Sequence, residues 1–125
     1  MTNDSGFRPS KAQDMLVLDA LIYEFPFSKK EATEKLIRGR LKRKKLGPFD
    51  LQRVALLRRL KDELQQQVNV YGKSKYYRRR AGKYAEYQDY DIPRLTVDTQ
   101  RLFPEVSKEV IEWFVPFCVL TYYMR

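Results

Sequence analysis

Apolar residues recur at helical spacing in the first half of the chain and predict three helices there. The first should begin after Ser10, because Ser10 and Gln13 have the spacing of a capping box. Pro26 should end it. Its apolar positions extend almost all the way round, which is typical of a helix in the centre of a domain. These positions are Met15, Leu16, Val17, Leu18, Leu21, Ile22, Tyr23 and Phe25.

A second helix is predicted from Ser28 to about Leu41, because Ser28 and Glu31 form another capping box, S-K-K-E. Gly39 and the later Gly47 predict that this helix frays or ends in the following basic run. The basic run would then lie at a helix C-terminus, where the helix dipole favours cations, or in the loop beyond it. The inward face would consist of Ala32, Leu36 and Ile37.

The third helix has the clearest amphipathic pattern in the chain. Asp50 can cap its N-terminus. One stripe is apolar and should face the core: Leu51, Val54, Leu57, Leu60, Leu64 and Val68. The opposite face is predicted to be polar and solvated: Gln52, Arg53, Arg58, Arg59, Lys61, Asp62, Glu63 and Gln65.

The helical pattern fails between residues 71 and 94. Gly72, Gly82 and Pro93 interrupt this segment, which is predicted to be an ordered loop with some local strand or helix. A short hairpin that turns at residues 72–74 is the alternative. Beyond the segment, Pro104 suits the first turn of a fourth helix, and Pro116 indicates a kink or the start of a fifth.

Together these elements predict an all-α fold, a compact bundle of four to five helices with one long basic, Tyr-rich loop or short hairpin at residues 71–94. A chain of 125 residues, 43% apolar and 33% charged, is typical of one globular domain. We therefore expect a single helical domain over residues 1–125, with residues 1–9 disordered.

Positive charge is concentrated in two blocks that contain no acidic residue. Residues 35–46 contain seven Lys or Arg, and residues 71–85 contain six. Because the net charge of the whole chain is +9, the remainder of the chain is net acidic. A focused positive field of this kind is typical of proteins that bind polyanions. Nucleic acid, either RNA or DNA, is the first candidate, ahead of anionic lipid headgroups and acidic protein faces.

The second block also has tyrosines between its basic residues. Lys and Arg bind phosphates, and Tyr rings can stack on unpaired bases, so this mixture suits a nucleic-acid surface. The predicted binding residues are Arg38, Arg40, Lys42, Arg43, Lys44, Lys45, Lys73, Lys75, Tyr76, Tyr77, Arg78, Arg79, Arg80 and Lys83.

Other interpretations of the two blocks stay open at this point. The tyrosines can pack against the helices with only their hydroxyls in water, and the basic residues can form solvated edges. Residues 38–45 also resemble a nuclear import signal. A helix-turn-helix made of the first two helices would place Lys29, Lys30 and Thr33 in a DNA groove.

The sequence narrows the choice of catalytic chemistry. It contains no His and a single Cys, so the common triads, Cys–His dyads and zinc sites cannot be assembled. Cys118 lies in the apolar run VPFCVL and should be a buried thiol. Glu86, Asp89 and Asp91 could be considered for Mg²⁺, but they are better interpreted as solvated charges or partners of nearby Arg. Since both glycine-rich phosphate-binding motifs are also missing, we expect no enzyme, no cofactor and no metal.

An adaptor or assembly factor is the alternative function. The C-terminal run WFVPFCVLTYYMR is richer in aromatic residues than one small core requires. It could dock on an acidic protein partner or form a homodimer, with the basic blocks steering the association. No apolar run approaches the ~20 residues of a membrane-spanning helix, and the N-terminus lacks the apolar segment of a signal peptide. We therefore expect a cytoplasmic protein without a transmembrane segment.

Overall fold

The computed structural model describes residues 10–71, 73–78 and 85–124. The predicted disorder of residues 1–9 lies outside these ranges. Within them the fold is all-α, which confirms the predicted class. Its elements are α1 (Lys11–Leu21), α2 (Lys30–Lys44), α3 (Leu51–Gln67), the short 3₁₀ helix η1 (Tyr87–Asp89), α4 (Ile92–Leu102) and α5 (Lys108–Tyr122).

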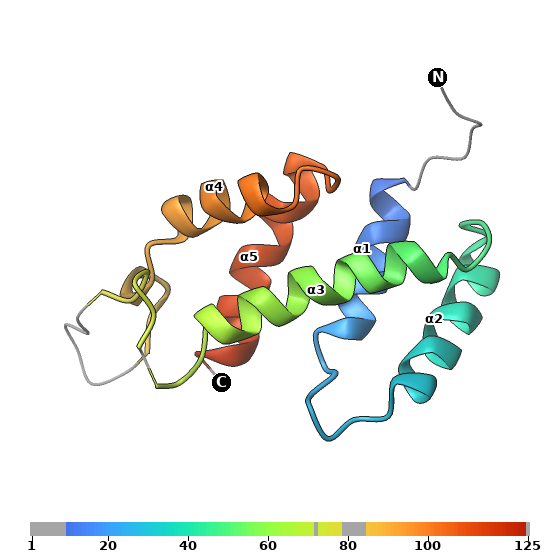
Figure 1. Ribbon diagram of the computed structural model, residues 1–125, viewed down its shortest axis with the longest axis horizontal. Helices are drawn as coiled ribbons and strands as arrows, with labels where there is room; N and C mark the ends of the chain where they lie inside the picture. Colours follow the sequence, from blue (N-terminus) through green and yellow to red (C-terminus); the bar gives the residue numbers. More distant parts are fainter. Residues whose placement is uncertain (1–9, 72, 79–84, 125) are drawn as a thin grey trace.

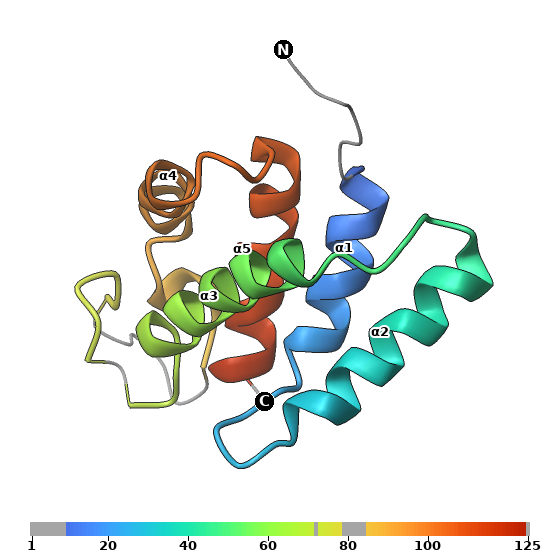
Figure 2. The same cartoon turned by 45° about the vertical axis from the view of Figure 1, so that its right-hand side comes forward.

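Helices α1, α3 and α5 form the middle of the bundle, and α2 and α4 lie on its two sides (Figures 1 and 2). α1 packs against α2, α3 and α5, which confirms its predicted central place. α2 packs mainly on α1, whereas α4 packs on α5. Because α2 has a helix on only one side, most of its surface faces outward.

Helices α1, α3, α4 and α5 each begin at a residue whose side chain caps the helix, whereas the N-cap of α2, Lys29, makes no such bond. Ser10 and Gln13 form the predicted capping box at α1, with the Ser10 hydroxyl accepting the Gln13 N–H at 3.1 Å. Asp50 caps α3 by accepting the Arg53 N–H, as predicted. Asp91 and Ser107 cap α4 and α5 in the same way.

The predicted start of the second helix at Ser28 is wrong. The Ser28 hydroxyl accepts the Phe25 N–H at 3.0 Å and so closes the turn around Pro26, and α2 begins only at Lys30. The helix also runs past Leu41 to Lys44 without a break, so its basic run lies in its last two turns. The predicted end of the first helix at Pro26 is also wrong, because α1 ends at Leu21. The earlier end and the later start together lengthen the link between α1 and α2 beyond the 3–4 residues of a helix-turn-helix.

The fourth helix was also placed wrongly. Pro93 lies in the first turn of α4, where its missing N–H costs no hydrogen bond, and it does not belong to the loop. Pro104 lies between α4 and α5. Pro116 does not start a new helix, because α5 continues through it to Tyr122.

Segment 73–78 is a loop that joins the far end of the bundle through a single antiparallel bridge, Tyr77 to Tyr90. The Arg78 N–H donates to the Asp89 carbonyl, and the Asp91 N–H donates to the Tyr76 carbonyl at 2.7 Å. Among the described residues no bridge pairs this segment with the end of α3, as the alternative hairpin would require, and Gly72 in its turn lies outside them.

The core lies between α1, α3 and α5, and its largest fully buried side chains come from all of the α-helices. They include Leu18, Leu21, Ile37, Leu57, Leu60, Leu64, Leu95, Ile111 and Phe114. Within the part of the chain that the structure describes, no helix is both long enough and apolar enough to span a bilayer.

Candidate nucleic-acid interface

α2 is attached to the bundle through a narrow apolar seam. Ile37 and Leu41, one turn apart, are buried against the rest of the protein. The predicted inward face is therefore wrong for Ala32 and Leu36, which are exposed. The Gln13 side chain donates to the Leu46 carbonyl just beyond the helix, which fixes its C-terminal end to α1. The last helical turn is closed by Lys45, which adopts the left-handed conformation with φ of 55°. The seam holds α2 in place while leaving its outer surface bare.

The outer surface of α2 is strongly basic. The basic residues between positions 35 and 46 form one ion pair with another described residue, from Arg40 to Asp19 at 3.1 Å. The Arg38 guanidinium stacks 3.9 Å from the centre of the Phe49 ring, which holds it against the following loop. The exposed cations of the surface are Lys35, Arg38, Lys42, Arg43, Lys44 and Lys45. We call these six residues the α2 basic face.

The second predicted block is only partly described. Arg79, Arg80 and Lys83 lie outside the described residues, whereas Lys73, Lys75 and Arg78 are exposed.

The two predicted stacking tyrosines face the interior. Tyr76 is buried, with its hydroxyl donating to Asp98 at 2.7 Å. Tyr77 is half-buried and packs edge-on against Tyr90 and Tyr123, at ring-centre distances of 5.5 and 6.0 Å. A nucleic-acid base could not reach the buried Tyr76 ring without displacing the residues that cover it.

Two acidic residues contact the described part of the second block in space, although none occurs within the block in sequence. Arg78 pairs with Asp91 at 3.2 Å, and Asp98 binds the Tyr76 hydroxyl. Arg94 lies over the same ring, 5.6 Å from its centre. The folded chain therefore offsets part of the charge that this block carries in the sequence.

The fold does not bring α2 and the described part of the second block together. Both ribbon views place α2 and segment 73–78 at opposite ends of the molecule, joined by α3 (Figures 1 and 2). α3 has 17 residues and is therefore about 25 Å long. One compact ligand cannot contact both α2 and segment 73–78.

We predict that the Tyr76 phenol titrates about two pH units above an ordinary tyrosine. Burial, with a further contribution from the hydrogen bond to Asp98, raises the pKa of Tyr76 to about 12 from its usual 10. Because the neutral form is favoured in the folded state, its contribution to stability should be lost as the pH rises from about 10 to about 12. Tyrosinate absorbance of the protein minus that of Tyr76→Phe measures this titration. A difference curve centred near 10 would contradict the burial.

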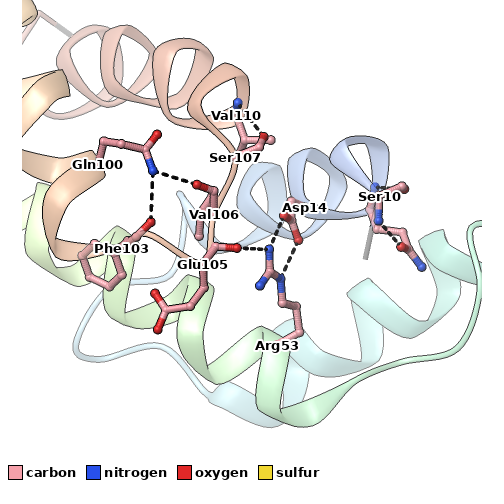
Figure 3. Close-up of polar contacts among 10 residues, drawn as sticks. Ser10, Asp14, Arg53, Gln100, Phe103, Glu105, Val106, Ser107 and Val110 are labelled. Carbon is pink, nitrogen blue, oxygen red and sulfur yellow. Dashed lines mark hydrogen bonds and ion pairs between the residues drawn. The ribbon is translucent and has the colours of Figure 1, made fainter. Parts of the chain in front are cut away.

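Two buried charge clusters, which the sequence did not reveal, hold the helices that carry α2. In the first, Arg53 forms a bidentate pair with Asp14, with Nε to Oδ1 at 3.0 Å and Nη2 to Oδ2 at 2.7 Å. Nη2 also donates to the Glu105 carbonyl at 3.1 Å (Figure 3). This cluster joins α1, α3 and the link between α4 and α5. The hydrogen bond to Asp14 raises the pKa of Arg53 despite its burial.

The second cluster lies just beyond the C-terminal end of α1, in the link to α2. Arg58 pairs with Glu24 at 2.6 Å, and the Lys61 ammonium donates to the Glu24 carbonyl at 2.8 Å. Burial raises the pKa of Glu24, but the bonds from Arg58 and Thr33 outweigh it and leave that pKa lowered.

The prediction that Lys61 is solvated is wrong, because its side chain is 3% exposed. Its spacing from the buried Leu57 and Leu64, four and three residues away, places it on the apolar stripe of α3 and could have revealed this.

The described residues form no recognisable catalytic or metal centre. An open cavity of about 530 Å³ lies beside the Glu24 cluster, but of its charged groups Arg58 pairs with Glu24 and Lys61 pairs with Asp62. No group of three His, Cys, Asp or Glu side chains among the described residues could hold a metal ion. Asp91 caps α4 and Asp89 accepts the Glu86 N–H, so these acids have structural contacts. Cys118 is buried, and burial raises its pKa well above the ordinary value.

The aromatic C-terminal run belongs mainly to the core of its own chain. Phe114 and Cys118 are fully buried, and Tyr122 and Tyr123 are nearly so. Leu120 is 47% exposed.

No family model, no curated protein and no solved structure matches this chain.

Proposed function

We propose that this protein binds nucleic acid without catalysing a reaction on it, and that the α2 basic face is its principal contact. The observation that carries the proposal is the exposure of six cations along about three turns, from Lys35 in α2 to its C-cap Lys45, on a helix that packs mainly on one neighbour. Lys and Arg at this density release counterions from a phosphate backbone, which supplies affinity without sequence readout. The proposed site of action is the cytoplasm, and RNA and DNA are both candidate ligands.

The proposal gives the second block a smaller role. Arg78 is paired with Asp91, and Tyr76 is turned inward with its hydroxyl on Asp98. Stacking on Tyr76 is therefore left out of the proposed contact. Lys73 and Lys75 remain exposed and could meet a longer strand that reaches the far end of the bundle.

An adaptor function is the weaker candidate. Its proposed interface was the C-terminal run, whose aromatic rings are occupied within the chain. The α2 basic face would still attract an acidic protein partner. A comparison of polyanions of different chemistry therefore has to accompany the nucleic-acid test.

We expect Lys42→Ala combined with Arg43→Ala to weaken binding by removing two phosphate contacts. Fluorescence anisotropy with labelled single-stranded and duplex oligonucleotides, at several salt concentrations, gives the slope of log affinity against log salt. The double variant should lower that slope by about 1.8 on duplex and about 1.4 on single strands. Both side chains are exposed, so the fold should be unchanged.

The matched control removes the same charge from the other side of the bundle. Arg101 and Lys108 are exposed cations on α4 and α5. Arg101→Ala combined with Lys108→Ala should leave the slope nearly unchanged. Equal effects of the two double variants would refute a contact centred on α2, and binding of heparin as tight as that of nucleic acid would refute nucleic-acid recognition.

A further inference from the structure

Gly39 lies in the interior of α2, where glycine costs about 1 kcal/mol relative to alanine. Its backbone is not in the left-handed region that favours glycine. Among the described glycines, Gly47 is the one in that region. A Cβ atom built on Gly39 would meet no atom of the protein within 4 Å. Neither the backbone conformation nor packing within the described chain therefore requires a glycine at this position.

Gly39 faces directly away from the bundle. It lies midway between Ile37 and Leu41, the two residues that bury α2 against the protein, and two residues along a helix amount to about half a turn. The side chains that surround it on the helix surface are those three and four residues away. They are Lys35, Leu36, Lys42 and Arg43, and all four are exposed.

We infer that a nucleic-acid backbone crosses α2 at Gly39, which serves as the point of closest approach. This inference rests on the proposed function and specifies the position of its ligand. Glycine lets a ligand approach a protein backbone closely. A sugar–phosphate chain in contact with the bare helix at Gly39 would have Lys35 on one side and Lys42 and Arg43 on the other.

The surroundings of Gly39 favour a phosphate backbone over a second protein helix. Close helix packing requires apolar side chains around the small residue. Here Leu36 alone is apolar, and the three other neighbours are long cations suited to phosphate oxygens.

The test adds bulk at Gly39 without changing charge. Gly39→Ala should raise the melting temperature slightly, because alanine favours the helix and meets no clash. Gly39→Met should keep the fold but weaken binding of a labelled duplex about tenfold, because the side chain holds the phosphates away from their cations. Ala32→Met is the control, since Ala32 is exposed on the same face two turns earlier, and it should change affinity less than about twofold.

The outcomes separate this inference from the proposed function. If the unaltered protein binds no oligonucleotide, the proposed function fails and the inference fails with it. A second outcome is that the unaltered protein binds and the double variant of Lys42 and Arg43 binds weakly. If folded Gly39→Met then binds like the unaltered protein, only the crossing at Gly39 is overturned. If poly-glutamate displaces the duplex as well as unlabelled duplex does, the partner is an acidic protein and the inference is overturned.

Discussion

Replacing Arg53 with methionine is expected to lower the free energy of unfolding by about 3–5 kcal/mol, because it leaves a buried carboxylate without its partner. The Asp14 side chain is 4% exposed, and Arg53 supplies both of its charged hydrogen bonds in Figure 3. The same guanidinium holds the Glu105 carbonyl, so the loss also loosens the link between α4 and α5. Denaturation in urea, followed by circular dichroism, measures the change.

Two further variants make the Arg53 result specific. Arg59→Met removes an exposed arginine from the same helix and should change stability by less than about 0.5 kcal/mol. Asp14→Leu combined with Arg53→Met should recover most of the loss, because no charge is then buried alone. A cost below about 1 kcal/mol for Arg53→Met alone would show that water reaches Asp14.

The sequence predicted helix starts well where no other hydrogen bond competed for the capping side chain. Ser10 and Asp50 each precede an apolar pattern, and both cap a helix as predicted. Ser28 has the same local signature, but its hydroxyl accepts the Phe25 N–H because Pro26 bends the chain back. Pro93 fits equally well in a loop and in a first helical turn, so its position alone could not place α4.

The candidate site was predictable as charge but not as geometry. The basic run of α2 is continuous in sequence, and a helix at the side of the bundle keeps it exposed. For the second block, the sequence allowed Asp91 to pair with a nearby Arg, as it does with Arg78, but it could not reveal that Asp98 reaches the Tyr76 hydroxyl. It also could not separate a stacking tyrosine from a packed one, since Tyr has an apolar ring and a polar tip. In the structure, the Tyr76 ring is buried and its hydroxyl donates a hydrogen bond to Asp98.

Charge pairs between distant residues were the hardest feature to predict. Arg53 and Asp14 are 39 positions apart, and each would be acceptable on a solvated helix face. Only the packing of α1 on α3 brings them together and excludes water. Their burial therefore follows from the fold and could not be derived from either helix alone.

Phe114→Ala is expected to lower the free energy of unfolding by about 3–5 kcal/mol, because α5 supplies the centre of the core. Phe114 is fully buried, and its ring centre lies 6.0 Å from that of Trp113 and 6.5 Å from that of Phe117. Removing the ring leaves a cavity that α1 and α3, on the other side of the core, can fill only in part. Urea denaturation of both proteins gives the difference.

Leu120→Lys tests whether the same helix also serves as an interface. Leu120 is 47% exposed, and a cation near the C-terminus of a helix is well tolerated, so the change should cost less than about 0.5 kcal/mol. Light scattering should show the same molecular mass before and after the substitution. If Leu120→Lys halves the mass of a dimer while Phe114→Ala costs under about 1 kcal/mol, the C-terminal run contributes more to assembly than to the core. The adaptor function would then be the better account of the protein.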